Sequence, residues 1–196
     1  MGRKSWISLA VLAVVAAVWS SCGGEETTPS ELTTPVEDAR APVETAEGTA
    51  EMVVDAVSGG EVNASAEVQG TSPLEVDINI LGATIGYQGY QYYLEWNPEL
   101  LAFDGHTDLK PAGLDLCATP TTSADRVAAG CISVAETTMF AGPVSTITFH
   151  CISNGTGPLH LVTSGESPAS FSTTMAPRGV IIPTELTDAS VTCLGP

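Results

Sequence analysis

Residues 89–101 read GYQYYLEWNPELL, and this stretch decides the fold class. Its aromatic and leucine side chains fall on every second residue, which is the period of a strand with one buried face. The positions expected to face the core are Tyr90, Tyr92, Leu94 and Trp96. The positions expected to face outward are Gln91, Tyr93 and Glu95. Asn97-Pro98 ends the strand, because proline has no backbone N–H to donate to a sheet ladder.

The same two-residue period recurs on both sides of this stretch. Leu74–Ile80 alternates apolar and polar side chains, and Val144–Ile152 and Leu159–Val162 flank a turn signal at Asn154–Gly157. Weaker strand patterns are Met52–Val57, Val62–Val68, Val127–Val134, Ser170–Met175, Val180–Ile182 and Ala189–Cys193.

Helical periodicity is not sustained anywhere in this region, and Glu99–Phe103 is expected to form one short turn at most. About nine short strands with turn signals every 8–12 residues or so are typical of a two-sheet sandwich. The sequence therefore predicts an all-β sandwich over residues 51–196.

The charge balance excludes one large class of partners. The chain has 196 residues, with 6 Lys+Arg against 23 Asp+Glu and a formal net charge of −17. Nucleic-acid affinity comes mainly from Lys and Arg that neutralise phosphates, and docking on anionic lipid needs a basic patch. We therefore expect no nucleic-acid binding, and basic or calcium-bearing partners are favoured.

The N-terminus has the pattern of a secretory signal. Arg3-Lys4 precedes a 14-residue apolar run, Trp6–Trp19, which is shorter than the roughly 20 residues of a membrane-spanning helix. Ser20–Gly24 resembles the cleavage site of a bacterial lipoprotein, in which the cysteine, here Cys22, receives a diacylglycerol. The tryptophan at the end of the apolar run stands where that family usually has a Leu-like residue. The alternative is an ordinary secretory signal with a chance cysteine.

Residues 22–50 are expected to form a disordered acidic tether. Residues 23–50 contain seven acids, six threonines and three prolines and no aromatic residue, so they cannot bury enough apolar surface to offset their ordering entropy. The expected organisation is a signal peptide at 1–21, a linker at 22–50 and one domain at 51–196. It predicts an extracellular or cell-surface protein that contacts the membrane only through a lipid on Cys22.

The five cysteines indicate an oxidising compartment. Without Cys22 four remain, an even number, and none has a zinc-ligand spacing. Cys117 and Cys131 enclose a Thr/Ser/Asp loop that a disulfide would pin, which leaves Cys151 to pair with Cys193. Four cysteines allow three connectivities, and the sequence alone does not choose among them.

Several of these segments together resemble the cohesin family. Cohesins have a strand of alternating aromatics that ends in an aromatic residue, then Asp/Asn-Pro, then a leucine, as in Gly89–Leu101. The strand Leu74–Ile80, the segment Val144–Leu159 and the closing Asp188–Val191 resemble further family segments in the same order. The resemblance covers about residues 50–194. The four cysteines and the acidic tether depart from the best-known cohesins.

The resemblance implies a nine-stranded jelly-roll sandwich without catalysis. Cohesins bind dockerins, which are small calcium-binding helical modules, and some carbohydrate-binding modules share the fold. The resemblance thus implies a dockerin-like protein partner at the cell surface, in the setting of polysaccharide catabolism. Carried over by position, the partner-binding residues are Gln91, Tyr93 and Glu95.

Two other functions stay open at this point. A carbohydrate-binding module could stack sugars on exposed aromatics, and Tyr93 and Tyr87 are the candidates for rings outside the core. A structural envelope protein would need no specific ligand.

No enzyme, metal or cofactor is expected. The histidines His106, His150 and His160 are scattered, and Asp104–Asp108 lacks the spacing of a calcium loop. Gly165–Ala169 matches only half of a nucleophile elbow.

Overall fold

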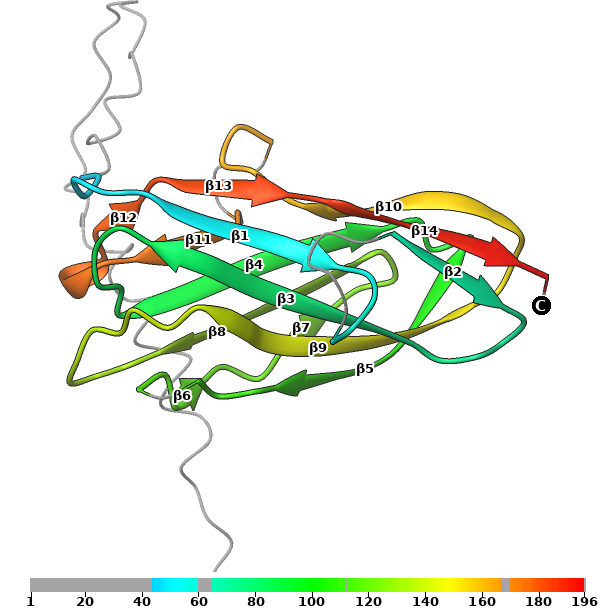
Figure 1. The fold of residues 1–196 in the computed structure, drawn as a ribbon, viewed down its shortest axis with the longest axis horizontal. Coiled ribbons are helices and arrows are strands. Elements are labelled where there is room, and N and C mark those ends of the chain that lie inside the picture. Colours follow the sequence, from blue (N-terminus) through cyan, green and yellow to red (C-terminus); the bar gives the residue numbers. More distant parts are fainter. Residues whose placement is uncertain (1–43, 60–64, 112, 167–169, 196) are drawn as a thin grey trace, which may run out of the picture. The chain divides into compact units, whose positions relative to one another are not determined.

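The computed structural model describes residues 44–59, 65–111, 113–166 and 170–195. These residues form two sheets that pack face to face (Figure 1). The predicted signal peptide, the lipidation residue Cys22 and residues 22–43 of the predicted linker lie outside the described residues. Within the described part of the chain, no helix is long and apolar enough to cross a membrane.

One sheet, called the β9 sheet here, has five strands in the order β13-β1-β3-β9-β5. Its strands are β13 (Thr184–Thr187), β1 (Ala50–Asp55), β3 (Leu74–Ala83), β9 (Gly142–Cys151) and β5 (Leu101–Asp108). The β1/β13 pair is parallel, and the other pairs are antiparallel.

The second sheet, called the β4 sheet, is built around β4 (Gly89–Trp96). One edge of β4 pairs with β10 and β11, and the other edge pairs with β8. Its remaining strands are β12 (Ile181–Ile182), β11 (Thr173–Met175), β10 (Gly155–Leu161), β14 (Ala189–Leu194), β2 (Ala66–Gln69), β8 (Arg126–Ile132), β6 (Leu116–Cys117) and β7 (Thr121–Thr122). A short 3-10 turn, Pro177–Gly179, joins β11 to β12.

The all-β sandwich predicted from the sequence is confirmed, and most of the predicted strands are present. The main difference is β5, where the sequence predicts only a short turn. Its side chains are mostly half-exposed, and a bulge between Phe103 and Gly105 interrupts its register with β9, so the two-residue period is lost. The edge strand β13 is also absent from the prediction, and β10 begins at Gly155 rather than at Leu159.

The domain begins earlier than the expected boundary at residue 51. Ala50 is the first residue of β1 and is buried. The Ala46 N–H donates to the Ile181 carbonyl at 2.8 Å, and the Thr49 N–H donates to Thr84 Oγ1 at 2.8 Å. The described end of the expected tether, residues 44–50, is therefore hydrogen-bonded to the domain.

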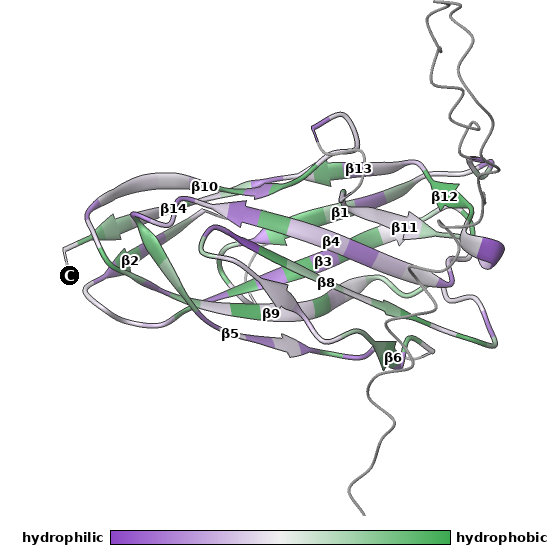
Figure 2. Ribbon diagram, turned by 180° about the vertical axis from the view of Figure 1, so that it is seen from behind, coloured by the Kyte–Doolittle hydropathy of each residue, from purple (hydrophilic) through white to green (hydrophobic). Residues whose placement is uncertain are grey.

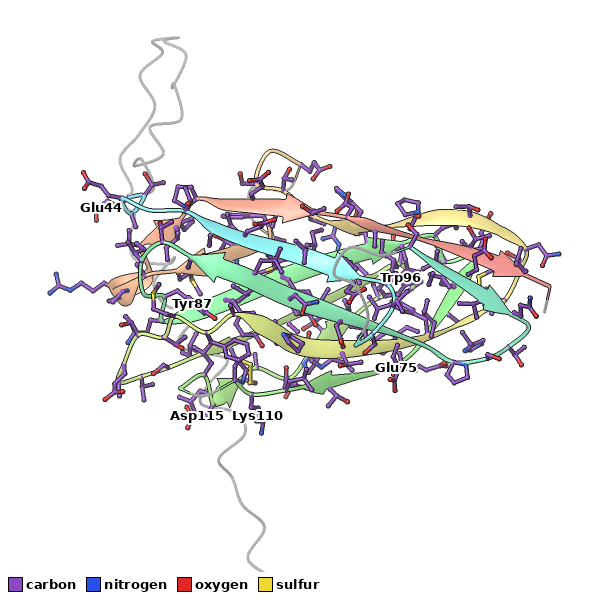
Figure 3. The ribbon with its side chains drawn as sticks, viewed as in Figure 1. Glu44, Glu75, Tyr87, Trp96, Lys110 and Asp115 are labelled. Atoms are coloured by element: carbon purple, nitrogen blue, oxygen red, sulfur yellow. A yellow bond between two sulfur atoms is a disulfide. The ribbon has the colours of Figure 1, made fainter. Side chains whose placement is uncertain are left out.

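Strand β4 supplies the centre of the core. All four of its predicted inward residues are buried, and the Trp96 ring lies edge-on to Phe149 of β9 with ring centroids 4.9 Å apart. Tyr87 is also fully buried, contrary to the suggestion that it lies outside (Figure 3). Its hydroxyl donates to the Phe140 carbonyl at 2.9 Å, and burial raises the pKa of Tyr87 to about 12.

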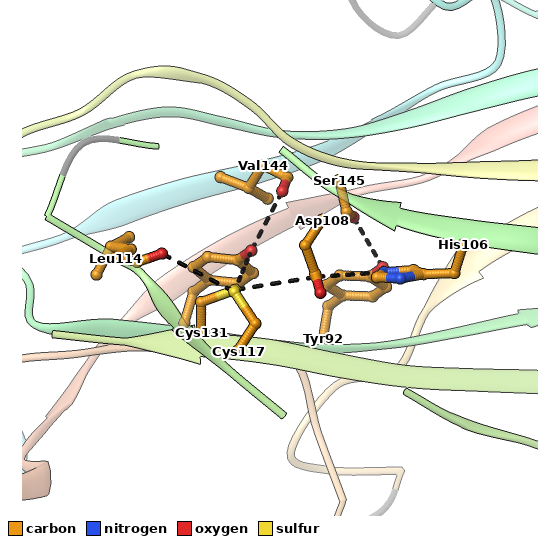
Figure 4. Close-up of a disulfide and its surroundings, with 9 residues drawn as sticks. Tyr92, His106, Asp108, Leu114, Cys117, Cys131, Val144 and Ser145 are labelled. Atoms are coloured by element: carbon orange, nitrogen blue, oxygen red, sulfur yellow. Dashed lines mark hydrogen bonds and ion pairs between the residues drawn. A yellow bond between two sulfur atoms is a disulfide. The ribbon is translucent and has the colours of Figure 1, made fainter. Parts of the chain in front are cut away.

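Two tyrosines of β4 reach across the sandwich to polar atoms of the β9 sheet. Ser145 Oγ donates to the Tyr92 hydroxyl at 2.7 Å, and His106 Nε2 lies 2.8 Å from the same oxygen. The Tyr90 hydroxyl donates to the Val144 carbonyl at 3.2 Å (Figure 4). Burial lowers the pKa of His106 even though Asp108 opposes the shift, so this histidine is a neutral member of the network.

The structure contains two disulfides. Cys117–Cys131 joins β6 to β8, and Cys151–Cys193 joins β9 to β14 and so connects the two sheets. These are the same two pairs that the loop argument favours. In the chain-entropy model, a disulfide that closes a loop as short as that between Cys117 and Cys131, which are 14 residues apart, stabilises the fold by about 3 kcal/mol.

Replacing Phe149 tests the aromatic packing between the sheets. Phe149→Ala removes a fully buried ring that contacts Trp96 and Phe103, so we expect a loss of about 3–5 kcal/mol in the free energy of unfolding. Urea denaturation followed by tryptophan fluorescence measures this loss. The control is Thr148→Ala on the other face of β9, which should cost less than about 1 kcal/mol. Equal losses in the two variants would contradict the assigned core.

Replacing Tyr92 tests the polar contacts that cross the core. Tyr92→Phe leaves Ser145 Oγ and His106 Nε2 without their common partner, and we expect this to cost about 1–3 kcal/mol. Tyr93→Phe is the matched control on the adjacent outward position and should change stability by less than about 0.5 kcal/mol. The same urea denaturation experiment measures the stability of both variants. A denaturation midpoint of Tyr92→Phe equal to that of the unmodified chain would show that the network contributes nothing to stability.

Candidate protein-binding face

The outward side chains of β6, β8, β4, β10 and β14 form one surface, which we call the outer face. Figure 2 shows the β4 sheet from this side. Gln91, Tyr93 and Glu95 follow one another along β4, each half-buried, while their neighbours in the sequence point into the core. The two-residue period thus places all three predicted partner-binding residues on one surface.

The middle of the outer face is formed by small residues around Tyr93. Strand register places Ala128 of β8 opposite Tyr93 and Gly130 opposite Gln91. A Cβ on Gly130 would lie 2.5 Å from the Tyr90 carbonyl oxygen, so only glycine allows β8 to approach β4 this closely. The residue directly opposite Tyr93 on β8 is therefore small.

The three predicted residues differ in how firmly they are held. Gln91 Nε2 donates to the Phe171 carbonyl at 3.1 Å, and the Arg126 guanidinium pairs with Glu95. The Tyr93 hydroxyl has no hydrogen-bond partner among the described residues. Its backbone N–H donates to Ser172 Oγ at 3.1 Å. Tyr93 is thus the outward side chain most available to a partner.

Beyond Gln91 the outer face becomes apolar. Leu116 of β6 lies directly opposite Ile132 of β8, and both are more than 40% exposed. Ile132 in turn lies opposite Gly89, where an added Cβ would meet its Cγ2 at 2.8 Å. The glycine therefore leaves room for the isoleucine to lie over β4, and the apolar side chains continue the row formed by Gln91 and Tyr93.

The other end of the outer face is charged. His160 of β10 lies opposite Glu95 in the strand register. Its Nδ1 is 2.6 Å from Asp188 Oδ2, and its Nε2 is 3.0 Å from Glu166 Oε1. The row therefore runs Arg126, Glu95, His160 and then two further carboxylates. No pattern in the sequence indicates this arrangement, because it depends on the pairing of β10 with β4 and on the turn before β14.

The three histidines lie in separate places, as their scatter in the sequence predicts. His106 belongs to the buried tyrosine network, and His150 Nδ1 lies 2.8 Å from Asp104 on the β9 sheet. Within the described residues, one group of three side chains brings its potential metal-ligand atoms within 4.8 Å of one another, namely Asp108, Cys117 and Cys131. Its two sulfurs are bonded to each other and are not thiolates, so this group is a disulfide beside a carboxylate (Figure 4).

Comparisons with known proteins give a match by fold only. No protein-family model matches the chain, and no curated protein sequence matches it. The chain is similar to the seventh ScaB type I cohesin of Pseudobacteroides cellulosolvens, with a TM-score of 0.56 and 12% identity over 75% of this chain and 93% of that one.

Two further cohesins show the same likeness. The cohesin module of a Clostridium perfringens family 33 glycoside hydrolase has a TM-score of 0.56 and 16% identity over 76% of this chain and 98% of that one. The Clostridium thermocellum cohesin solved as the Coh-OlpA–Doc918 complex has a TM-score of 0.55 and 12% identity over 74% and 99% of the two chains. The described domain is a cohesin-like β-sandwich.

Proposed function

We propose that this chain is a non-catalytic module that binds a dockerin-like protein through its outer face. The observation that carries the proposal is the fold: structures with this arrangement of strands include a cohesin–dockerin complex. The chain places Gln91, Tyr93 and Glu95 in one row on an outward surface of that fold. These are the positions that the resemblance assigns to partner binding.

The composition of the outer face supports a protein partner. Protein interfaces combine a central aromatic anchor with apolar neighbours and a polar rim. Here Tyr93 lies between the apolar pair Leu116 and Ile132 and the charged pair Glu95 and Arg126. Since the Arg126–Glu95 pair is about one-third exposed, it contributes little to stability and is open to exchange partners on binding.

Two clefts among the described residues lie away from this face. A cleft of about 610 Å³ is lined by β1, β3 and the start of β13, and one of about 580 Å³ lies beside β2 and the start of β3. Gln91, Tyr93 and Glu95 line neither cleft. A flat row of side chains suits a folded partner better than it suits a small molecule, which would need a concave site.

The proposed setting is the cell surface. The sequence signals at 1–21 and Cys22 support secretion and lipid attachment, and the acidic segment up to residue 43 would hold the domain away from the membrane. Two disulfides are consistent with an oxidising compartment.

A carbohydrate ligand has less support from the structure. Sugar binding by stacking uses exposed flat aromatics, and Tyr87, Tyr90, Tyr92 and Trp96 are all buried. On β4, only Tyr93 offers an outward aromatic ring.

Replacing Tyr93 tests the binding proposal. We expect Tyr93→Ala to weaken the affinity for a calcium-loaded dockerin module encoded in the same genome by about tenfold or more, because tyrosines at interface centres are common hot spots. Isothermal titration calorimetry with the full chain measures this affinity. Thr107→Ala, on the outward side of the β9 sheet, is the control and should bind as the unmodified chain does. Equal weakening by both variants, or none by Tyr93→Ala, would count against the outer face.

Affinity electrophoresis on polysaccharide gels separates the carbohydrate alternative. We expect the full chain to migrate equally in gels with and without polysaccharide, because one outward tyrosine makes a small platform for sugars. Retardation of the unmodified chain that is abolished in Tyr93→Ala would instead establish a glycan site and reject the protein-partner proposal.

A further inference from the structure

The contacts of His160 require both of its ring nitrogens to donate. A neutral imidazole has one N–H donor and one acceptor, whereas an ionised carboxylate only accepts. Nδ1 lies 2.6 Å from Asp188 Oδ2 and Nε2 lies 3.0 Å from Glu166 Oε1. Both contacts are hydrogen bonds only when the ring carries two protons and a positive charge.

The two carboxylates are held in place by other groups as well. The Leu161 N–H donates to Asp188 Oδ1 at 2.8 Å, so Asp188 is attached to the backbone of β10 independently of the histidine. Glu166 accepts from the Thr163 N–H and hydroxyl, both at 2.8 Å, within its own turn. The His160–Glu166 contact is therefore the side-chain bond that ties the turn Thr163–Glu166 to β10.

This turn borders the outer face next to Tyr93. Val162, one residue before the turn, donates its N–H to the Tyr93 carbonyl at 3.0 Å. Ser172 donates its N–H to the Val162 carbonyl at 2.9 Å, and its hydroxyl oxygen accepts from the Tyr93 N–H. Movement of the turn is thus coupled to the backbone on either side of Tyr93.

We infer that the His160 side chain is a pH-responsive ionic bridge between Glu166 and Asp188 on the outer face, and we call this bridge the clasp. When charged, its ring holds the turn Thr163–Glu166 and Asp188 together, and when it loses its Nε2 proton it releases Glu166. A neutral Nε2 would present its lone pair to a carboxylate oxygen 3.0 Å away, and that contact is repulsive. Nδ1 keeps its proton, because its contact with Asp188 is the shorter one and Asp188 is anchored to the backbone.

The surrounding charges favour the charged ring. Three carboxylates face it from three elements: Glu95 on β4, Glu166 in the turn and Asp188 before β14. A cation, Arg126 on β8, lies on the far side of Glu95 and is paired with it. Burial lowers the pKa of His160, but the hydrogen bonds and charges of Asp188 and Glu166 outweigh burial and raise the pKa overall.

The ring does not form a metal site with these carboxylates. Its two nitrogens point in opposite directions, and each faces a different carboxylate, so a single ion cannot bind one nitrogen and both acids. The geometry is that of an imidazolium bridging two anions.

The sign of the pH dependence follows from the raised pKa. In the unfolded chain the histidine has an ordinary pKa of about 6.5. The clasp stabilises the fold fully below that pH, and its contribution is lost as the pH rises through the higher pKa of the folded state. If the outer face binds the proposed partner, affinity falls over the same pH range, because a released turn must be ordered again on binding. That last consequence, and only that one, rests on the proposed function.

A partner-free experiment on the full chain tests the clasp. The ring proton signals of His160, assigned by their loss in His160→Gln, are followed by NMR from pH 5 to 9, roughly the range in which histidine titrates. We expect a titration midpoint above 6.5 that moves down in Glu166→Gln, because the negative charge is removed while the side chain keeps its size. We expect the hydrogen-exchange protection factor of the Val162 amide, which donates to the Tyr93 carbonyl, to fall by about tenfold above the midpoint. In His160→Gln that protection should be independent of pH.

His150→Gln is the matched control, since His150 pairs with Asp104 on the other sheet and should leave both measurements unchanged. A His160 midpoint at or below 6.5 would overturn the clasp, as would Val162 amide protection that stays constant across the titration of the unmodified chain. Because no partner is present, neither outcome depends on whether the outer face binds a dockerin. Conversely, a confirmed clasp with no dockerin affinity would reject only the binding proposal.

Discussion

The sandwich depends on the two tyrosine hydroxyls that strand β4 sends across the core. Tyr90 and Tyr92 are buried, and a buried hydroxyl without a partner would cost free energy comparable to a lost hydrogen bond or more. One partner of Tyr90, Cys131 Sγ at 3.1 Å, lies on β8 of the same sheet, but the Val144 carbonyl and the side chains of Ser145 and His106 belong to the opposite sheet. The hydroxyls therefore fix how the two sheets are aligned as well as filling the space between them.

The same constraint determines the outer face. Slipping β4 by one residue would turn Tyr90 and Tyr92 outward and bring Gln91 and Glu95 into the core, where an amide and a carboxylate would lose their solvent contacts. The register of β4 thus determines both which of its side chains fill the core and which form the outward row Gln91, Tyr93 and Glu95.

The sequence was sufficient for the features that depend on short-range alternation. The inward and outward positions of β4 follow directly from residues 89–96 and need no knowledge of distant contacts. Tyr87 does not follow, because its burial depends on pairing with Thr138 and on the carbonyl of Phe140. Residues 44–49 are similar: their composition is typical of a tether, and their hydrogen bonds go to Ile181 and Thr84, which lie far along the chain.

The outer face shows the same division between local and distant information. That Gln91, Tyr93 and Glu95 share a surface is a local property. That Arg126 pairs with Glu95, and that His160 lies opposite Glu95, depends on the registers of β8 and β10 against β4. No spacing in the sequence brings these residues together. A search for catalytic or metal-binding motifs could not find them either, because an imidazolium between two carboxylates belongs to neither class.

The net charge of the whole chain does not describe how charges are arranged on the outer face. A net charge of −17 suggests a uniformly acidic surface that would attract any cation. On the outer face the two cationic positions, Arg126 and charged His160, lie on either side of Glu95, so the signs alternate along the row. Alternating charges select the orientation and register of a partner more than they raise its affinity. The excess of acids therefore argues against nucleic acid, and under the proposed function the arrangement of a few charges around Glu95 would discriminate among protein partners.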